Sequence, residues 1–133
     1  MENKRAHLEM IQDVVTRLAH NSFLLKGWSV VLVSALFALA ASESKPVFVY
    51  LAYLPVLAFW LLDGYYLRQE RLFRKLYDNV RMLPEERIDF GMSTRNLVPN
   101  VSSWCKTLLS VSIVLFHGAM LLAIVLVSVL ASI

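Results

Sequence analysis

Three stretches of the chain carry no charged residue over most of their length, and they alternate with segments in which charge is frequent. They are residues 27–41, 47–62 and 107–133. A membrane-spanning helix needs about 20 mainly apolar residues, at a rise of roughly 1.5 Å each. The first two stretches reach this length as residues 23–42 and 47–66, so the pattern predicts three transmembrane helices.

A short polar turn joins the first two spans. It runs from Ser42 to Pro46, and a proline suits the first turn of the helix that follows. These spans are therefore expected to form a hairpin. Pro55 lies within the second span and leaves the carbonyl of Leu51 without its usual helical partner, so we expect a kink there.

Before the first span, apolar positions recur in alternating steps of three and four, which is the heptad spacing of one narrow helical face. They are Leu8, Ile11, Val15 and Leu18, continued by Ser22 and Leu25. No proline precedes Gly27, so this helical arm is expected to run directly into the first span.

The same spacing recurs after the second span and ends at Pro84. Its positions are Leu62, Tyr66, Gln69, Phe73, Leu76, Val80 and Leu83. Because both arms leave one hairpin, we expect them to pair as an antiparallel coiled coil that projects roughly 30 Å into the cytoplasm. In the alternative arrangement, one arm lies among the lipid headgroups with its basic side toward lipid.

The expected fold is an all-α integral membrane protein in three parts. Residues 1–83 hold the arms and the hairpin, residues 84–100 form a connector with room for one helical turn after Pro84, and residues 101–133 form the third span, which Ser102 or Ser103 can cap. The run from Ala38 to Ala40 resembles a signal-peptide cleavage site, but the organised helix before it favours a retained span.

Basic residues are distributed unevenly about these spans, and this predicts the orientation. Lys4, Arg5, Arg17 and Lys26 precede the first span, only Lys45 lies in the hairpin turn, and the others lie between the second and third spans. The positive-inside rule then places the N-terminus and the connector on the cytoplasmic side of a bacterial inner membrane. It places the C-terminus in the periplasm or outside the cell.

Composition agrees with a lipid bilayer as the main partner. The chain is 58% hydrophobic, and its net charge of +3 is accounted for by topology and by the anionic leaflet, so no nucleic-acid partner is expected. The single cysteine, Cys105, cannot form an internal disulfide.

Two titratable positions in the spans are candidates for function. His117 lies well inside the third span, either as a proton-sensitive or pore-lining group or as a neutral imidazole hydrogen-bonded to a neighbouring helix. Asp63 ends the second span at the depth of Lys26 on the first, so a salt bridge across the hairpin is expected.

The sequence contains no catalytic triad pattern, carboxylate pair or metal-ligand spacing, so we expect no enzyme activity, catalytic residue, cofactor or metal site. Small residues recur on the first and third spans and allow close helix contact, within one chain or between copies. Three helices enclose a pore poorly, so a pore requires a homo-oligomer. A transporter is disfavoured, because neither an inverted repeat nor a pair of interrupted helices is expected.

The arm, the tight hairpin and the charged helix YYLRQERLFRKLYDNVR at residues 65–81 resemble the SLATT-type small bacterial membrane effector proteins over residues 1–83. The third span departs from their simplest two-span plan. The resemblance implies an oligomer that permeabilises or depolarises the membrane in antiviral defence when a cytosolic partner signals.

Two functional hypotheses follow. In the first, the chain is a small oligomeric inner-membrane effector or signalling subunit whose arms receive a signal and whose spans respond. In the second, it is a passive anchor or scaffold that holds a soluble cytoplasmic partner through the arms.

Overall fold

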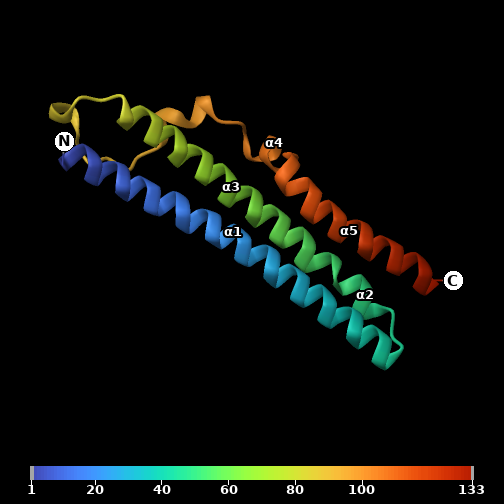
Figure 1. Cartoon of the computed structure of the whole chain (residues 1–133). Coiled ribbons are helices and arrows are strands. Elements are labelled where there is room, and N and C mark those ends of the chain that lie inside the picture. The colour runs from blue at the N-terminus through green and yellow to red at the C-terminus, as the bar shows by residue number, and fades with distance from the viewer. Residues whose placement is uncertain (1, 133) are drawn as a thin grey trace.

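The computed structural model describes residues 2–132, and every regular element in this range is helical (Figure 1). Three helical stretches are long and apolar enough to cross a membrane, as predicted. The first is α1 (Glu2–Glu43), and the second combines α2 (Val47–Leu51) with α3 (Tyr53–Arg81). The third is α5 (Val111–Ser132), which follows the short helices η1 (Glu85–Arg87), η2 (Arg95–Asn100) and α4 (Trp104–Leu108).

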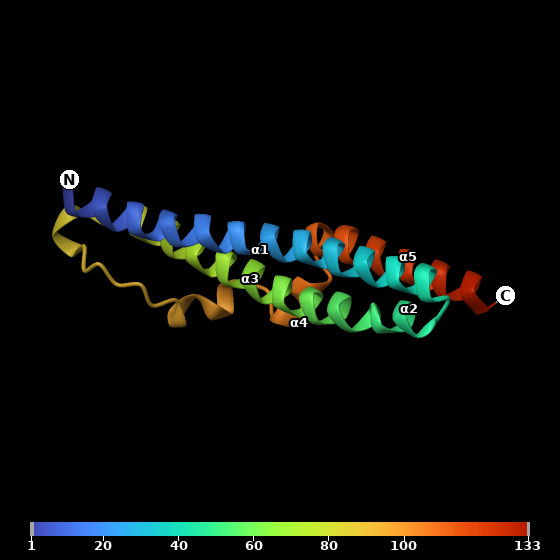
Figure 2. The ribbon, with the colours of Figure 1, turned by 90° about the horizontal axis from the view of Figure 1, so that it is seen from below.

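Helices α1 and α3 lie side by side and run in opposite directions (Figures 1 and 2). Helix α5 covers the half of this hairpin nearest to α2, while the connector returns along α3 from the opposite end (Figure 2). The 42 residues of α1 correspond to a length of roughly 63 Å. One unbroken helix therefore joins the end of the molecule that holds the connector to the end that holds α5.

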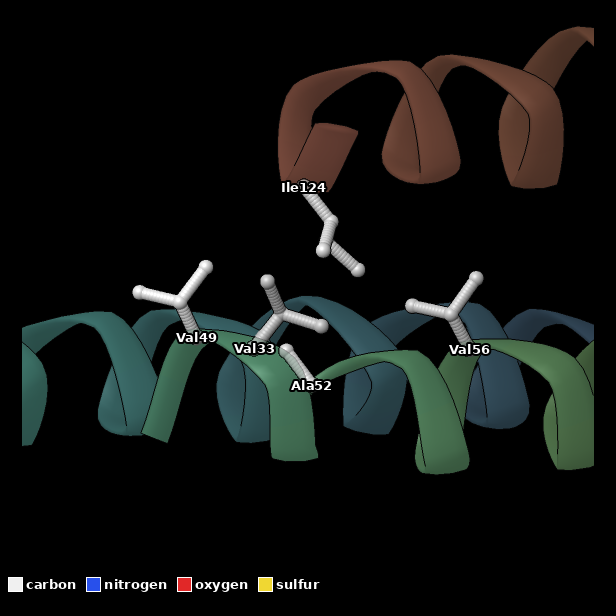
Figure 3. Packing of buried hydrophobic residues seen from close by; sticks show 5 residues of the cluster. All are labelled: Val33, Val49, Ala52, Val56 and Ile124. Atoms are coloured by element: carbon white, nitrogen blue, oxygen red, sulfur yellow. The ribbon is translucent and has the colours of Figure 1, made fainter. Parts of the chain in front are cut away.

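The apolar core lies where α5 rests on the hairpin. It consists of Val33 from α1, Val49 from α2, Ala52 and Val56 from the start of α3, and Ile124 from α5. Ile124 points from α5 toward the four residues of the hairpin (Figure 3), and it is fully buried. These contacts hold the third long helix on the first two.

Only part of the expected interface between the arms is fully buried. Ile11, Val15 and Val80 are buried, while the other expected interface residues are half-buried, namely Leu8, Leu18, Phe73 and Leu76. Leu72 is buried although the heptad seam did not include it, and Leu62, which the seam did include, is exposed. The reason is that α3 also packs against η2 and α4, so its covered face is wider than one heptad seam and is rotated away from Leu62.

The second long helix is interrupted at Ala52, one turn before Pro55. Pro55 has no N–H to donate to the carbonyl of Leu51, so one backbone hydrogen bond of the helix is missing there. The helix is therefore interrupted near the position at which the kink was expected.

The expectation of one helix over residues 101–133 was wrong, because this region is divided into two helices. Helix α4 ends at Leu108 and α5 begins at Val111. The N–H of Leu109 bonds the carbonyl of Lys106 in a tight turn, and the carbonyl of Leu108 accepts a hydrogen bond from Trp60 Nε1 of α3 at 3.0 Å. The break thus depends on a partner in another helix, which local sequence does not indicate. Ser103 caps α4, as predicted.

The connector is attached to the start of α1 at two points. The Glu85 carboxylate accepts hydrogen bonds from the backbone N–H groups of Asn3 and Lys4, at 2.9 and 3.1 Å. The buried His7 side chain bonds the carbonyl of Gly91 through Nε2 at 2.8 Å. Helix η1 supplies the turn expected after Pro84, whereas η2 was not predicted.

Candidate functional site

The three long helices meet at one buried carboxylate. Asp63 of α3 is fully buried, and its Oδ2 lies 2.6 Å from Lys26 Nζ of α1 and 2.8 Å from His117 Nε2 of α5. The Lys26–Asp63 salt bridge expected across the hairpin is present. A hydrogen bond from His117 to a neighbouring helix was one of its two expected roles, but Asp63 was not predicted as the partner.

Ser22 completes this polar cluster. Its hydroxyl donates to Asp63 Oδ1, and Lys26 Nζ donates to Ser22 Oγ at 2.9 Å. Ser22 and Lys26 lie one turn apart on α1, so both side chains reach the same carboxylate. The sequence offered one signal for this role, a serine on an otherwise apolar seam four residues before a lysine.

The His117 ring is enclosed by aromatic side chains. Trp60 stacks on it, with ring centroids 6.0 Å apart and an angle of 14° between the planes, and Phe116 meets its edge. Because a carboxylate only accepts hydrogen bonds, the proton on Nε2 is the one that faces Asp63. Nδ1 is buried and has no hydrogen-bond partner within the described range.

A buried carboxylate is costly unless cations and hydrogen-bond donors surround it. Asp63 receives one cation and one hydroxyl from α1 and one N–H group from α5. The Lys26 side chain is 25% exposed, so the cluster reaches the molecular surface through this residue. The cluster therefore joins all three long helices, and Lys26 of α1 forms its solvent-accessible side.

A second polar contact ties α5 to α3 at the other end of the apolar core. Ser128 Oγ donates to the carbonyl of Ile124 at 2.8 Å, so the hydroxyl of Tyr53, 3.1 Å away, donates to Ser128. Positions 117 and 128 are separated by roughly 16 Å along the helix. Helix α5 is thus bound to α3 at two levels with apolar packing between them.

Lys26, Asp63 and His117 come together, whereas the fourth candidate does not join them. Pro55 lies about two turns before Asp63 on α3 and contributes the helix break instead. Across residues 2–132, no group of three or more His, Cys, Asp or Glu side chains is placed to hold a metal ion.

Comparison with protein-family models, with curated proteins and with solved structures finds no match to this chain.

Proposed function

We propose that this chain is a small oligomeric inner-membrane effector or signalling subunit. Its three long helices cross the membrane, and the arms at the N-terminal end lie in the cytoplasm. Three helical stretches of sufficient length and apolar character support this, as does the concentration of Lys and Arg away from the hairpin turn. The resemblance of residues 1–83 to SLATT-type proteins supports a role in bacterial antiviral defence.

The observation that carries the proposal is that the Asp63 carboxylate binds groups from both other long helices. Helices α1 and α3 run without a break from the arms to this carboxylate. A rotation or shift of α1 against α3 would change the distance from Lys26 to Asp63. Because His117 bonds the same oxygen, such a movement in the arms would reach the third span.

The response of the spans requires several copies of the chain. Within one chain, Asp63 and His117 are both fully buried and line no aqueous path. A pore or depolarising assembly would form when neighbouring chains share helices whose polar groups have been released from the cluster. The signal would be the binding of a soluble cytoplasmic partner to the arms.

The test is the mass of the purified protein in native nanodiscs, followed by single-channel recording on the same sample. We expect a defined oligomer that conducts, and we expect His117→Ala to change its conductance or open probability. His20→Ala is the matched control, because His20 is exposed on the arm and should leave both unchanged.

A monomer or dimer that never conducts would contradict the effector and favour the passive anchor. In that case polar substitutions at Leu76 and Val80, which disturb the packing of the arms, would release a soluble partner and leave membrane potential unaffected.

A further inference from the structure

A groove lies between α3 and the end of the connector, away from the polar cluster. Its volume is about 390 Å³. The residues that line it on the α3 side are Arg71, Arg74, Lys75 and Asp78, and those on the connector side include Asn100 and Ser102.

The two walls of the groove are held together by a neighbouring arginine. Arg68 precedes Arg71 by one turn on the same face of α3, and its Nε donates to the carbonyl of Ser102 at 3.3 Å. This bond keeps the connector wall opposite the basic face. Helix η2, which ends at Asn100 of this wall, also packs against α3, so both walls belong to segments in contact with each other.

The basic residues of the groove differ in their partners. Arg74 Nη2 lies 3.0 Å from Glu70 Oε1, so this guanidinium is already paired and is less available to another anion. Within the described range, no carboxylate oxygen lies within 4.0 Å of the charged groups of Arg71 or Lys75. Asp78 is the acidic residue of the lining, and it is exposed one turn beyond Lys75.

The proximity of Arg71 to Lys75 does not stabilise α3, although Asp78 lies one turn beyond Lys75. Arg71 and Lys75 are four residues apart, and like charges at this spacing destabilise a helix. The packing of the arms does not require either charge, since the buried face nearby is formed by Leu72 and Val80. An anion between Arg71 and Lys75 would remove this repulsion.

We propose that the groove binds a phosphate group, carried either by a soluble phosphate compound or by a lipid headgroup. The planar fork of Arg71 and the ammonium of Lys75 are the donors that phosphate oxygens prefer. The amide of Asn100 and the hydroxyl of Ser102 stand on the opposite wall and add neutral donors. The proposal is independent of the effector function, because it concerns binding alone.

The experiment is a titration of the full chain with pyrophosphate in lipid-free detergent micelles at low ionic strength, followed by calorimetry. The double variant Arg71→Gln/Lys75→Gln should weaken binding about tenfold or more. The control Arg17→Gln/Arg81→Gln removes the same charge from exposed positions outside the groove. It should retain the affinity of the unaltered chain, and an equal loss in both double variants would overturn the proposal.

Asp78→Asn provides a second test that does not depend on a loss of binding. It removes the opposing charge from the groove and should tighten binding of pyrophosphate by a few-fold. No gain in this variant, together with no loss in Arg71→Gln/Lys75→Gln, would also overturn the proposal.

The source of the phosphate is distinguished by repeating the measurement with lipid. Binding of pyrophosphate in micelles indicates a soluble ligand. Groove-dependent enrichment of phosphatidylglycerol around the protein in mixed nanodiscs, without pyrophosphate binding, indicates a lipid headgroup. The absence of both signals would show that the groove is not a phosphate site.

Discussion

Gly64 of α3 packs directly against the side chain of Leu108 at the end of α4. A β-carbon on Gly64 would overlap Leu108 Cδ2 and would lie 3.1 Å from Leu108 Cγ and 3.4 Å from Trp104 Nε1. At the same junction, Trp104 Nε1 donates to the carbonyl of Leu61 at 3.1 Å. The missing side chain at position 64 therefore allows the close approach by which α3 holds α4, the short helix that precedes α5.

Gly64→Val should destabilise the protein by about 1–3 kcal/mol, because the added atoms force Leu108 and α4 away from α3. Gly27→Val is the matched control, since no heavy atom lies within 4 Å of a β-carbon built there. Unfolding in mixed detergent, followed by tryptophan fluorescence, measures the difference. Since valine has a higher helix propensity than glycine, Gly27→Val should not lose stability, and equal losses in the two variants would contradict a specific role for the contact with Leu108.

Ser22→Ala should destabilise the protein by about 1 kcal/mol, because its hydroxyl bonds both Asp63 and Lys26. Ser29→Ala on the same helix should be neutral or stabilising. Ser29 is fully buried, and its hydroxyl has no hydrogen-bond partner within residues 2–132. The same unfolding measurement compares the two, and an equal effect would contradict a specific role for Ser22.

Glu85 should make the attachment of the connector to α1 dependent on pH. Partial desolvation favours the neutral acid, but interactions that favour the carboxylate, among them hydrogen bonds from the N–H groups of Lys4 and Asn3, together outweigh it and hold the pKa of Glu85 below its usual value of 4.5. Since the pKa is lowered in the folded state, the stabilisation is complete above this usual value. It is lost as the pH falls through the lower pKa of the folded state.

Amide hydrogen exchange of the first turn of α1, corrected for the intrinsic rate at each pH, measures this effect. Exchange should accelerate as the pH falls below about 4.5. In Glu85→Gln it should already be faster at neutral pH and no longer respond to acid in this range. Glu86→Gln changes the neighbouring exposed carboxylate and should behave like the unaltered chain.

The proposed orientation in the membrane predicts which loops are accessible from outside the cell. In a Cys105→Ser background, a cysteine at Ser42 should react with an impermeant maleimide in intact bacteria. A cysteine at Ser93 in the connector should react only after the membrane is permeabilised. Both positions are exposed in the folded chain, so burial does not confound the comparison. The reverse labelling pattern would contradict the positive-inside assignment.

The existence and number of the long helices were predictable from the sequence because hydrophobicity and backbone hydrogen bonding are local properties. Apolar runs of sufficient length, the polar turn before Pro46 and the end of the arm near Pro84 are visible without tertiary structure. The salt bridge between Lys26 and Asp63 was predictable for a related reason. When the position of the turn in a hairpin is known, residues at the same distance from the turn on the two helices lie opposite each other.

Only the tertiary structure decided which residues of neighbouring helices meet. On α5, a stripe with small and polar positions that includes His117, Ile124 and Ser128 predicts the buried face, whereas the pairing of His117 with Asp63 depends on where this face lies against α3. The burial of Leu72 in place of Leu62 has the same origin, because η2 and α4 cover part of α3. The break after Leu108 likewise depends on Trp60, a hydrogen-bond donor 48 residues earlier in the chain. The relative placement of the helices and the pairing of distant donors and acceptors are properties of the packed molecule, and no local segment of the chain determines them.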